Sequence, residues 1–255
     1  MRLRQSVGAG ALVLLLVAGC DSGPSAAGPA SATTTAPEAS ATEAAEPAES
    51  VSLPPGAQPG LDDLNGDSTP DPTCGQQDFG GGLVLRIPCT VPNPNDPEDG
   101  VRLVKDSLYR LPALDADLTG ISGSLVTARD AAGKKVVIVV FNSDNLFATG
   151  SDQLSENNTL AAVITLINAK FPGSTIQVRG HTDTTGTAAS NQALSERRAG
   201  TVKGYLTGHG TSAAAVTSVG LGSSRPLAEE TNADGSPSLP GRAFNRRVEI
   251  SLRRP

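Results

Sequence analysis

Apolar and polar residues begin to follow regular patterns at about residue 101, which predicts that a folded region starts there. Two stretches, SGSLVTAR and VVIVVF, flank a turn that contains Gly133, a pattern typical of two adjacent strands. The next apolar residues recur at three- and four-residue spacing, at Leu160, Val163, Ile164 and Ile167. This spacing predicts a helix, and Ser155 is its expected N-cap.

The rest of the folded region predicts one more helix and three more strands. Residues 175–179 alternate as a strand does, and a second helix is expected over about 189–207, ended by the glycines within 208–210. A short strand is expected at 216–221, and clean alternation over 247–252 predicts the last strand. This order predicts an α/β (α+β) fold in which helices pack on one face of a mixed sheet.

The first residues, MRLRQSVGAGALVLLLVAGC, have the pattern of a secretory signal peptide. A start with two arginines is followed by a short apolar run and then by small residues, and the run is too short to span a bilayer comfortably. Val17-Ala18-Gly19-Cys20 resembles the lipobox of bacterial lipoproteins. The resemblance implies that residues 1–19 are removed and that Cys20 carries a diacylglycerol and a palmitate chain, instead of remaining a free cysteine.

Residues 20–60 are expected to form a disordered tether. After Cys20 this segment consists largely of Ala, Ser, Pro, Thr, Glu and Gly, which have too little to bury to offset their ordering entropy. Three cysteines are an odd number for an exported protein. If Cys20 is lipidated, Cys74 and Cys89 remain as a pair, for which a disulfide is favoured over two buried free thiols.

Residues 61–130 contain one possible metal-binding pattern. Oxygen-bearing side chains alternate there, at Asp63, Asn65, Asp67, Thr69 and Asp71, and resemble the front half of a calcium loop. The turn glycine of such a loop is Ser68 here, and its final glutamate is Cys74. A solvated, turn-rich stretch is therefore favoured and no metal is expected, with calcium as the weaker alternative. The role of residues 61–130 stays open.

Charge and motif content narrow the possible functions. The formal net charge is -6 and the pI is near 5.0, which argues against nucleic-acid binding. The two histidines, His181 and His209, belong to no hydrolase motif, so neither an enzyme nor a cofactor is expected. His181 is instead interpreted as a packed residue at the end of a strand.

The stretch GHTDTTGTAASNQALSERR contains the main candidate site. Asp183 follows a predicted strand, and Arg198 lies on the inward stripe of the second predicted helix, together with Asn191. The apolar members of that stripe are Leu194, Val202 and Tyr205. A guanidinium on an apolar stripe needs a partner. Asp183 and Arg198 could form an internal ion pair, or both could face an open pocket and bind a zwitterion, and the residues alone leave these alternatives open.

Five stretches in order resemble one known family. GHTDTTG, NQALSERRA, GLGSSRP and NRRVEISL, preceded by LFATGSDQLSENNTL, are similar to the OmpA-like peptidoglycan-binding domain shared with MotB, over about residues 135–255. The resemblance implies a βαβαββ sandwich, within an expected domain 131–255, that binds diaminopimelate of peptidoglycan non-covalently. Asp183 then holds the ligand's ammonium group and Arg198 its carboxylate. Asn191 adds a hydrogen bond and Thr185 contributes through its backbone.

The sequence also departs from that family. Gly150-Ser151 stands where an acidic or amide residue is usual, so ligand contacts from this loop are in doubt. Residues 231–244 are expected as a flexible loop. Arg246 and Arg247 are interpreted as anchors of the last strand rather than as a binding patch.

These observations predict an exported lipoprotein that tethers a membrane to the cell wall through peptidoglycan. A MotB-type stator is disfavoured, because it needs an uncleaved membrane helix and the apolar segment here ends in a lipobox. The alternative is a cell-envelope sensor or adhesin in which residues 61–130 bind a protein partner.

Lipidation of Cys20 is directly testable. The mature protein should partition into detergent and incorporate radioactive palmitate, because two or more acyl chains give stable anchoring. Cys20→Ser should abolish both properties, and Cys74→Ser is the matched cysteine control that should keep them. Continued labelling of the Cys20→Ser protein would contradict the assignment.

Overall fold

A computed structural model describes residues 53–91, 101–114, 121, 123–155 and 158–255 of the chain. The predicted signal peptide, Cys20 and most of the predicted tether lie outside the described residues, so their assignments stay predictions. None of the helices within the described part has the length and apolar character needed to cross a membrane.

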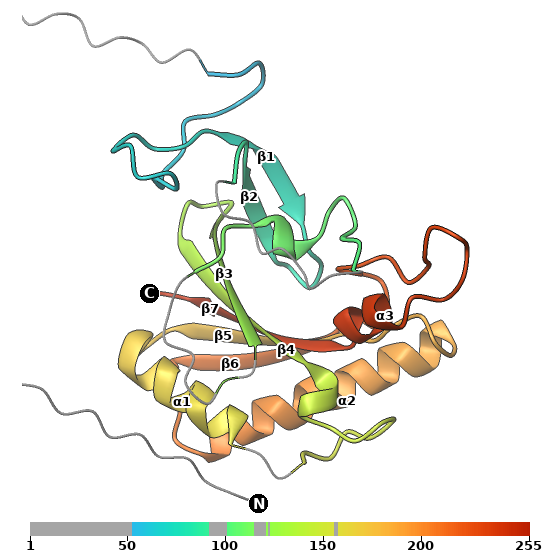
Figure 1. Cartoon of the computed structure of the whole chain (residues 1–255). Coiled ribbons are helices and arrows are strands. Elements are labelled where there is room, and N and C mark those ends of the chain that lie inside the picture. The colour runs from blue at the N-terminus through green and yellow to red at the C-terminus, as the bar shows by residue number, and fades with distance from the viewer. Residues whose placement is uncertain (1–52, 92–100, 115–120, 122, 156–157) are drawn as a thin grey trace, which may run out of the picture. The chain divides into compact units, whose positions relative to one another are not determined.

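Seven strands form one mixed sheet in the order β1-β2-β3-β4-β7-β5-β6, in which only β5 and β6 pair in parallel (Figure 1). The strands are β1 Thr73–Asp78, β2 Val84–Pro88, β3 Gly123–Asp130, β4 Lys135–Asn142, β5 Thr175–Gly180, β6 Ala215–Gly220 and β7 Arg247–Arg253. The helices are α1 Thr159–Lys170, α2 Ala188–Gly208 and α3 Leu239–Asn245, with short 3-10 turns η1 Leu108–Arg110 and η2 Ser143–Asn145.

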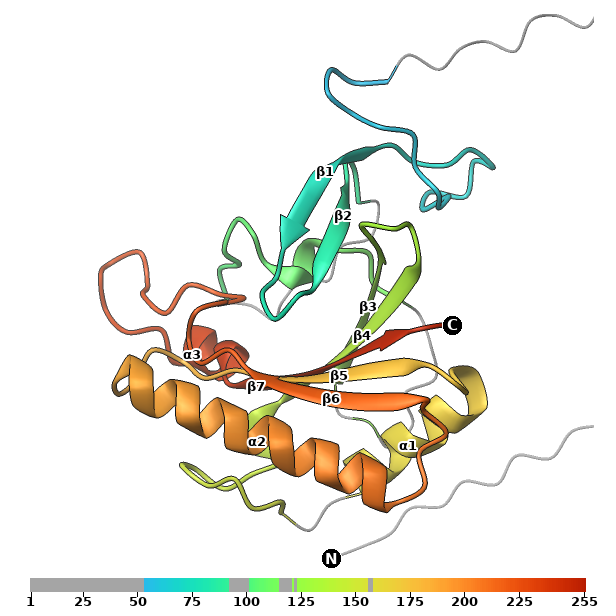
Figure 2. The same ribbon diagram turned by 180° about the vertical axis from the view of Figure 1, so that it is seen from behind.

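From β4 onward the chain follows the predicted order β4-α1-β5-α2-β6-β7, with the short helix α3 added between β6 and β7, so the βαβαββ expectation is confirmed. Helices α1 and α2 lie on the same face of the sheet (Figures 1 and 2). Their apolar residues share one core with alternate residues of β4, β5 and β7, among them Val139, Val163, Val178, Val202 and Ile250. The predicted fold class is therefore correct.

The expected N-cap of the first helix was wrong. Helix α1 begins at Thr159 with Asn158, not Ser155, at the N-cap position. Ser155 belongs to the preceding segment, where its amide donates to the Leu146 carbonyl.

The expected loop 231–244 was also wrong in part. It contains most of α3, whose N-cap Ser238 accepts a hydrogen bond from Gly241. Seven residues with a proline and a glycine give too little periodicity to predict this helix.

The opposite face of the sheet carries a second core. Its buried residues come from both sides of position 130: Phe79, Leu83, Leu85, Leu108, Tyr109, Leu111, Val126, Ala128, Val136, Ile138, Val140 and Leu227. Strand β3 pairs with β4 along its whole length, from Gly123↔Phe141 to Arg129↔Lys135. Residues 61–130 and 131–255, expected as separate regions, thus share a sheet and a core.

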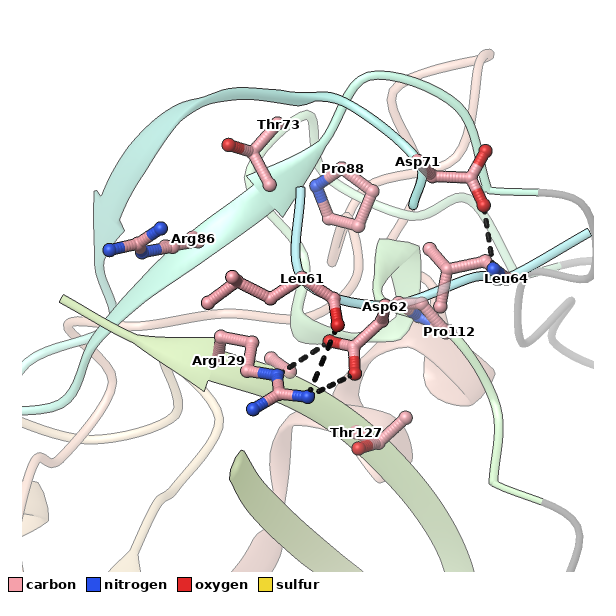
Figure 3. Close-up of a pocket in the computed structure, with 11 residues that line it drawn as sticks. Leu61, Asp62, Leu64, Asp71, Thr73, Arg86, Pro88, Pro112, Thr127 and Arg129 are labelled. Atoms are coloured by element: carbon pink, nitrogen blue, oxygen red, sulfur yellow. Dashed lines mark hydrogen bonds and ion pairs between the residues drawn. The ribbon is translucent and has the colours of Figure 1, made fainter. Parts of the chain in front are cut away.

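The chain ahead of β1 packs on β3 as well. Asp62 accepts hydrogen bonds of 2.8 and 2.6 Å from Nε and Nη2 of Arg129, beside a small, mainly apolar cavity of about 30 Å³ that Leu61 and Pro88 help to line (Figure 3). Backbone pairing reaches back to Gln58, which bridges to Thr73. The expected tether boundary at residue 60 is therefore too late, because Gln58 already pairs with the edge of β1.

The alternating oxygen side chains of residues 63–71 bond mostly to their own loop. Asp63 accepts from the amides of Gly66 and Ser68, Asp67 accepts from Thr69, Asn65 accepts from Asp67, and Asp71 accepts from Leu64. Such side-chain-to-backbone bonds are typical of turns. Within the described residues no three His, Cys, Asp or Glu side chains are grouped to hold a metal ion.

A disulfide joins Cys74 in β1 to Cys89 just after β2, as predicted. It closes a loop with a sequence separation of 15 residues. A cross-link of that length stabilises a fold by about 3 kcal/mol, mainly by restricting the unfolded chain.

Buried charges connect β5, β7 and the second core. Glu249 accepts from Nε of Arg179 at 2.8 Å and from Nε of Arg247 at 2.8 Å, and all three side chains are almost fully buried. Nε2 of His181 lies 3.3 Å from the same carboxylate. The interpretation of His181 as a packed strand-end residue agrees with this position. Burial would raise the pKa of Glu249, but the positive charges around it hold that pKa well below its ordinary value.

His181 should make the protein sensitive to acid. Burial, with help from Arg247, lowers its pKa from 6.5 to about 4. Between these values the unfolded chain binds a proton that the folded chain does not, so stability falls as pH falls through this window. From pH 7 to 4.5 this one group should cost about 2 kcal/mol of unfolding free energy.

Denaturant unfolding at both pH values tests this effect. His181→Gln should lose a smaller amount of stability over the same interval than the wild type does. His209→Gln, at the exposed C-cap of α2, is the control and should behave like the wild type. An unchanged pH dependence in His181→Gln would refute the assignment.

Candidate functional site

The loop after β5 holds Asp183 in a fixed place. The amide of His181 donates to the Arg247 carbonyl and the amide of Thr182 donates to the Gly222 carbonyl, so the start of the loop stays attached to the sheet. Gly180 permits a close approach to α2, because a Cβ there would lie 2.2 Å from the Ser195 carbonyl oxygen. Asp183 is then 7% exposed.

Asn191 and Thr185 both bond to Asp183. The side-chain amide of Asn191 donates to the Asp183 carbonyl at 3.1 Å, and the backbone amide of Thr185 donates to Oδ1 of Asp183 at 2.9 Å. The backbone role expected for Thr185 is thus played toward Asp183 itself. Thr185 orients the carboxylate, Asn191 fixes the backbone of Asp183, and both residues also line the pocket described below.

Arg198 lies on the buried face of α2, as its position on the predicted stripe indicated. Its Nε donates to the Ser151 carbonyl at 2.8 Å, and its guanidinium lies over the Phe147 ring, 5.1 Å from the centroid. Nη1 and Nη2 donate no hydrogen bond to any residue that the structure describes. The loop at Gly150-Ser151, where the sequence departs from the family, thus contacts Arg198 through a backbone carbonyl, which orients the arginine.

The partner of Asp183 is Arg246, not Arg198. Nη1 of Arg246 donates to Oδ2 of Asp183 at 2.8 Å, while its Nε and Nη2 donate to Asp144 in η2. No ion pair joins Asp183 to Arg198 among the described residues. The alternative of an internal Asp183–Arg198 ion pair is thus wrong. The carboxylate of Asp183 is paired instead with Arg246, which directly precedes β7.

Arg246 and Arg247, which precede and begin β7, differ in their surroundings. Arg247 is buried in the Glu249 network and stabilises the last strand, as expected. Arg246 braces two loops but also lines the pocket, so the expectation that it is only an anchor was incomplete.

These residues line one open pocket of about 400 Å³: Asp144, Thr149, Gly150, Thr182, Asp183, Thr185, Asn191, Leu194, Arg198 and Arg246. All four predicted ligand-binding residues are among them. Two carboxylates face two guanidinium groups, so their charges cancel. A pocket of this kind favours a ligand with both charges over a simple ion.

The charged forms of both predicted residues are maintained. Burial raises the pKa of Asp183, but hydrogen bonds from Arg246 and Thr185 outweigh burial and hold this pKa below its ordinary value. Burial lowers the pKa of Arg198, while Asp144 opposes that effect. An arginine nevertheless stays protonated in proteins.

The sequence did not predict Asp144, Thr149 or Thr182 as site residues, and it did not predict that Arg246 lines the pocket. Asp144 follows β4 in the stretch NSDN, which has no periodicity and no spacing relation to the other site residues. Only the sheet order, which places β7 between β4 and β5, brings these loops together. The sequence did contain a signal for Arg246. It lies directly before the alternating residues of the last strand, and therefore outside the part of the chain whose side chains the strand buries.

Comparison with known proteins bears on the same part of the chain. The family model described as OmpA family matches residues 146–238. "Outer membrane porin F" of Pseudomonas fluorescens is 44% identical over 84 residues, which cover 33% of this chain and 24% of that protein.

Two further relatives are named as a probable lipoprotein and as a peptidoglycan-binding protein. "Probable lipoprotein YiaD" of Escherichia coli (strain K12) is 37% identical over 95 residues, 37% of this chain and 40% of that protein. "Peptidoglycan-binding protein ArfA" of Mycobacterium tuberculosis (strain ATCC 25618 / H37Rv) is 39% identical over 79 residues, 31% of this chain and 22% of that protein. The chain thus spans less than half the length of these relatives. Residues 146–238 are thus similar to the OmpA family, and the βαβαββ order spans the same part of the chain.

Proposed function

We propose that this protein binds peptidoglycan without covalent chemistry, and that the pocket around Asp183 and Arg198 receives the zwitterionic end of a diaminopimelate side chain. The observation that carries the proposal is that Nη1 and Nη2 of Arg198 donate to no residue in the described part of the chain, beside an oriented carboxylate in an open pocket with balanced charges. A relative of the matched region is named as peptidoglycan-binding.

The two ends of an amino acid head group match this arrangement. Nη1 and Nη2 of Arg198 can donate two parallel hydrogen bonds to a carboxylate, since its Nε is already bonded to Ser151. Each oxygen of Asp183 accepts one bond from the protein and keeps a second lone pair for an ammonium group. The pocket therefore favours an α-amino acid group, which carries both charges close together.

The chemistry of the pocket supports binding rather than hydrolysis. His181, two residues from Asp183, faces the buried Glu249 and is 1% exposed, so it is turned away from the pocket. The lining groups supply charges and hydrogen bonds to a bound ligand. We therefore assign the pocket a non-catalytic role.

The anchoring part of the proposal rests on the sequence before residue 53. The resemblance of Val17-Ala18-Gly19-Cys20 to a lipobox supports a lipid on Cys20, and the Ala- and Pro-rich segment that follows lies in the sequence between it and the domain. One relative of the domain is named as a probable lipoprotein. A lipid at one end and a peptidoglycan pocket at the other would tether a membrane to the cell wall.

Binding of the detergent-solubilised protein to purified sacculi tests the pocket. Asp183→Ala and Arg198→Ala should each weaken binding about tenfold to several-hundredfold, because each removes one charge-assisted contact. Arg198→Lys should also bind poorly, since a point charge cannot fork onto a carboxylate. Free diaminopimelate should compete with wild-type binding.

Arg197→Ala is the matched control. Arg197 is on the same helix but exposed, where it pairs with Asp152, and its loss should leave binding nearly normal. Melting temperatures of all variants must be compared. Folded Asp183 and Arg198 variants that bind as well as the wild type would place the site elsewhere and overturn the proposal.

A further inference from the structure

We propose that the protein has a second binding site, for an anionic group such as a carboxylate or a phosphate, in the cavity between the segment around β1 and η1 and the strands β5 and β7. The cavity has a volume of about 390 Å³ and is distinct from the Asp183 pocket. The inference does not rest on the proposed peptidoglycan binding.

The inner wall of the cavity holds an excess of buried positive charge. Arg179 and Arg247 line it together with Glu249, and their side chains are 1%, 3% and 2% exposed. Two guanidinium groups thus share one carboxylate. The nearby His181 adds no negative charge. Buried charges are costly unless they are paired, so this wall favours a further anion.

The other hydrogen bonds of Arg179 and Arg247 do not remove the excess of positive charge. Arg179 donates to the carbonyls of Phe79 and Gly80 at 2.6 and 2.7 Å, and Arg247 donates to the carbonyl of Arg225 at 2.9 Å. Carbonyls satisfy the donors, but they carry no net charge. The positive potential of the wall therefore extends into the cavity, which contains room for a small polar molecule.

The rim of the cavity carries two cations that can contact an anion. Lys105 and Arg225 are both exposed and line the cavity together with Asp78 and Asp106, so the excess of one positive charge over the whole lining comes from the buried inner wall. Arg225 is only loosely paired, with its Nη2 3.8 Å from Asp78. An exposed pair at that distance contributes little, so Arg225 can turn toward a ligand at small cost. Arginine also has the geometry that carboxylates and phosphates prefer.

Both parts of the chain are needed to build this cavity. Phe79 and Lys105 come from the region whose role the sequence left open, whereas Arg179, Arg225 and Arg247 come from the later part of the chain. The second site thus gives residues 61–130 a function beyond completing the sheet: they form one wall of a ligand cavity.

The full chain in detergent can be titrated with inorganic phosphate and, separately, with acetate at constant ionic strength, followed by the amide NMR signals. At least one of the two anions should cause saturable shifts at Phe79, Lys105 and Arg225. The double variant Lys105→Glu/Arg225→Glu should bind at least about tenfold more weakly, because two favourable charges become repulsive.

The matched control is Arg197→Glu/Lys203→Glu, which makes the same charge change on α2 and should keep wild-type affinity at these signals. Melting temperatures show whether the variants remain folded, and Lys105→Glu alone replaces the double variant if that one unfolds. Shifts that never saturate, shifts confined to residues 182–198, or equal affinity in the rim variant would each overturn the second site.

Discussion

The buried carboxylate of Glu249 is the interaction on which the rest of this structure depends. It receives guanidinium groups from both β5 and β7 and lies beside His181, where the loop that carries Asp183 begins. Removing one partner of such a network leaves an uncompensated buried charge, which costs far more than a surface ion pair. The network therefore fixes the relation between β5 and β7 and, through them, the start of the candidate binding loop.

The same network explains why the earlier part of the chain cannot be treated as an appendage. Arg179 needs the carbonyls of Phe79 and Gly80 to satisfy its donors, and the apolar back of β3 and β4 needs Leu83 and Leu108 to cover it. Without β3, strand β4 would lie at the edge of the sheet. Here β3 pairs with that edge, which protects it from association with other chains.

The candidate pocket leaves the charge of Arg198 without a carboxylate partner among the described residues. Arg246 is shared between Asp144 and Asp183, and Arg198 is oriented by a neutral carbonyl and an aromatic ring. Arg198 is thus held in place but keeps its charge for a ligand. A direct Asp183–Arg198 ion pair would have consumed both groups, and the pocket would then offer a ligand little beyond shape.

The sequence by itself determined the helices and strands from β3 to β7 apart from α3, the family resemblance of residues 146–238, the disulfide, and the placing of Asp183, Asn191 and Arg198 near one another. Local periodicity predicts the helices and strands. The resemblance of five short stretches indicates the family, the cysteine count predicts the disulfide, and spacing together with the resemblance groups the site residues. Only the tertiary structure decided the ion-pair partners. Asp144 and Arg246 are 102 residues apart in the chain, and they meet because β7 inserts between β4 and β5. The second core and the second cavity depend on the same long-range pairing, which no local pattern of residues records.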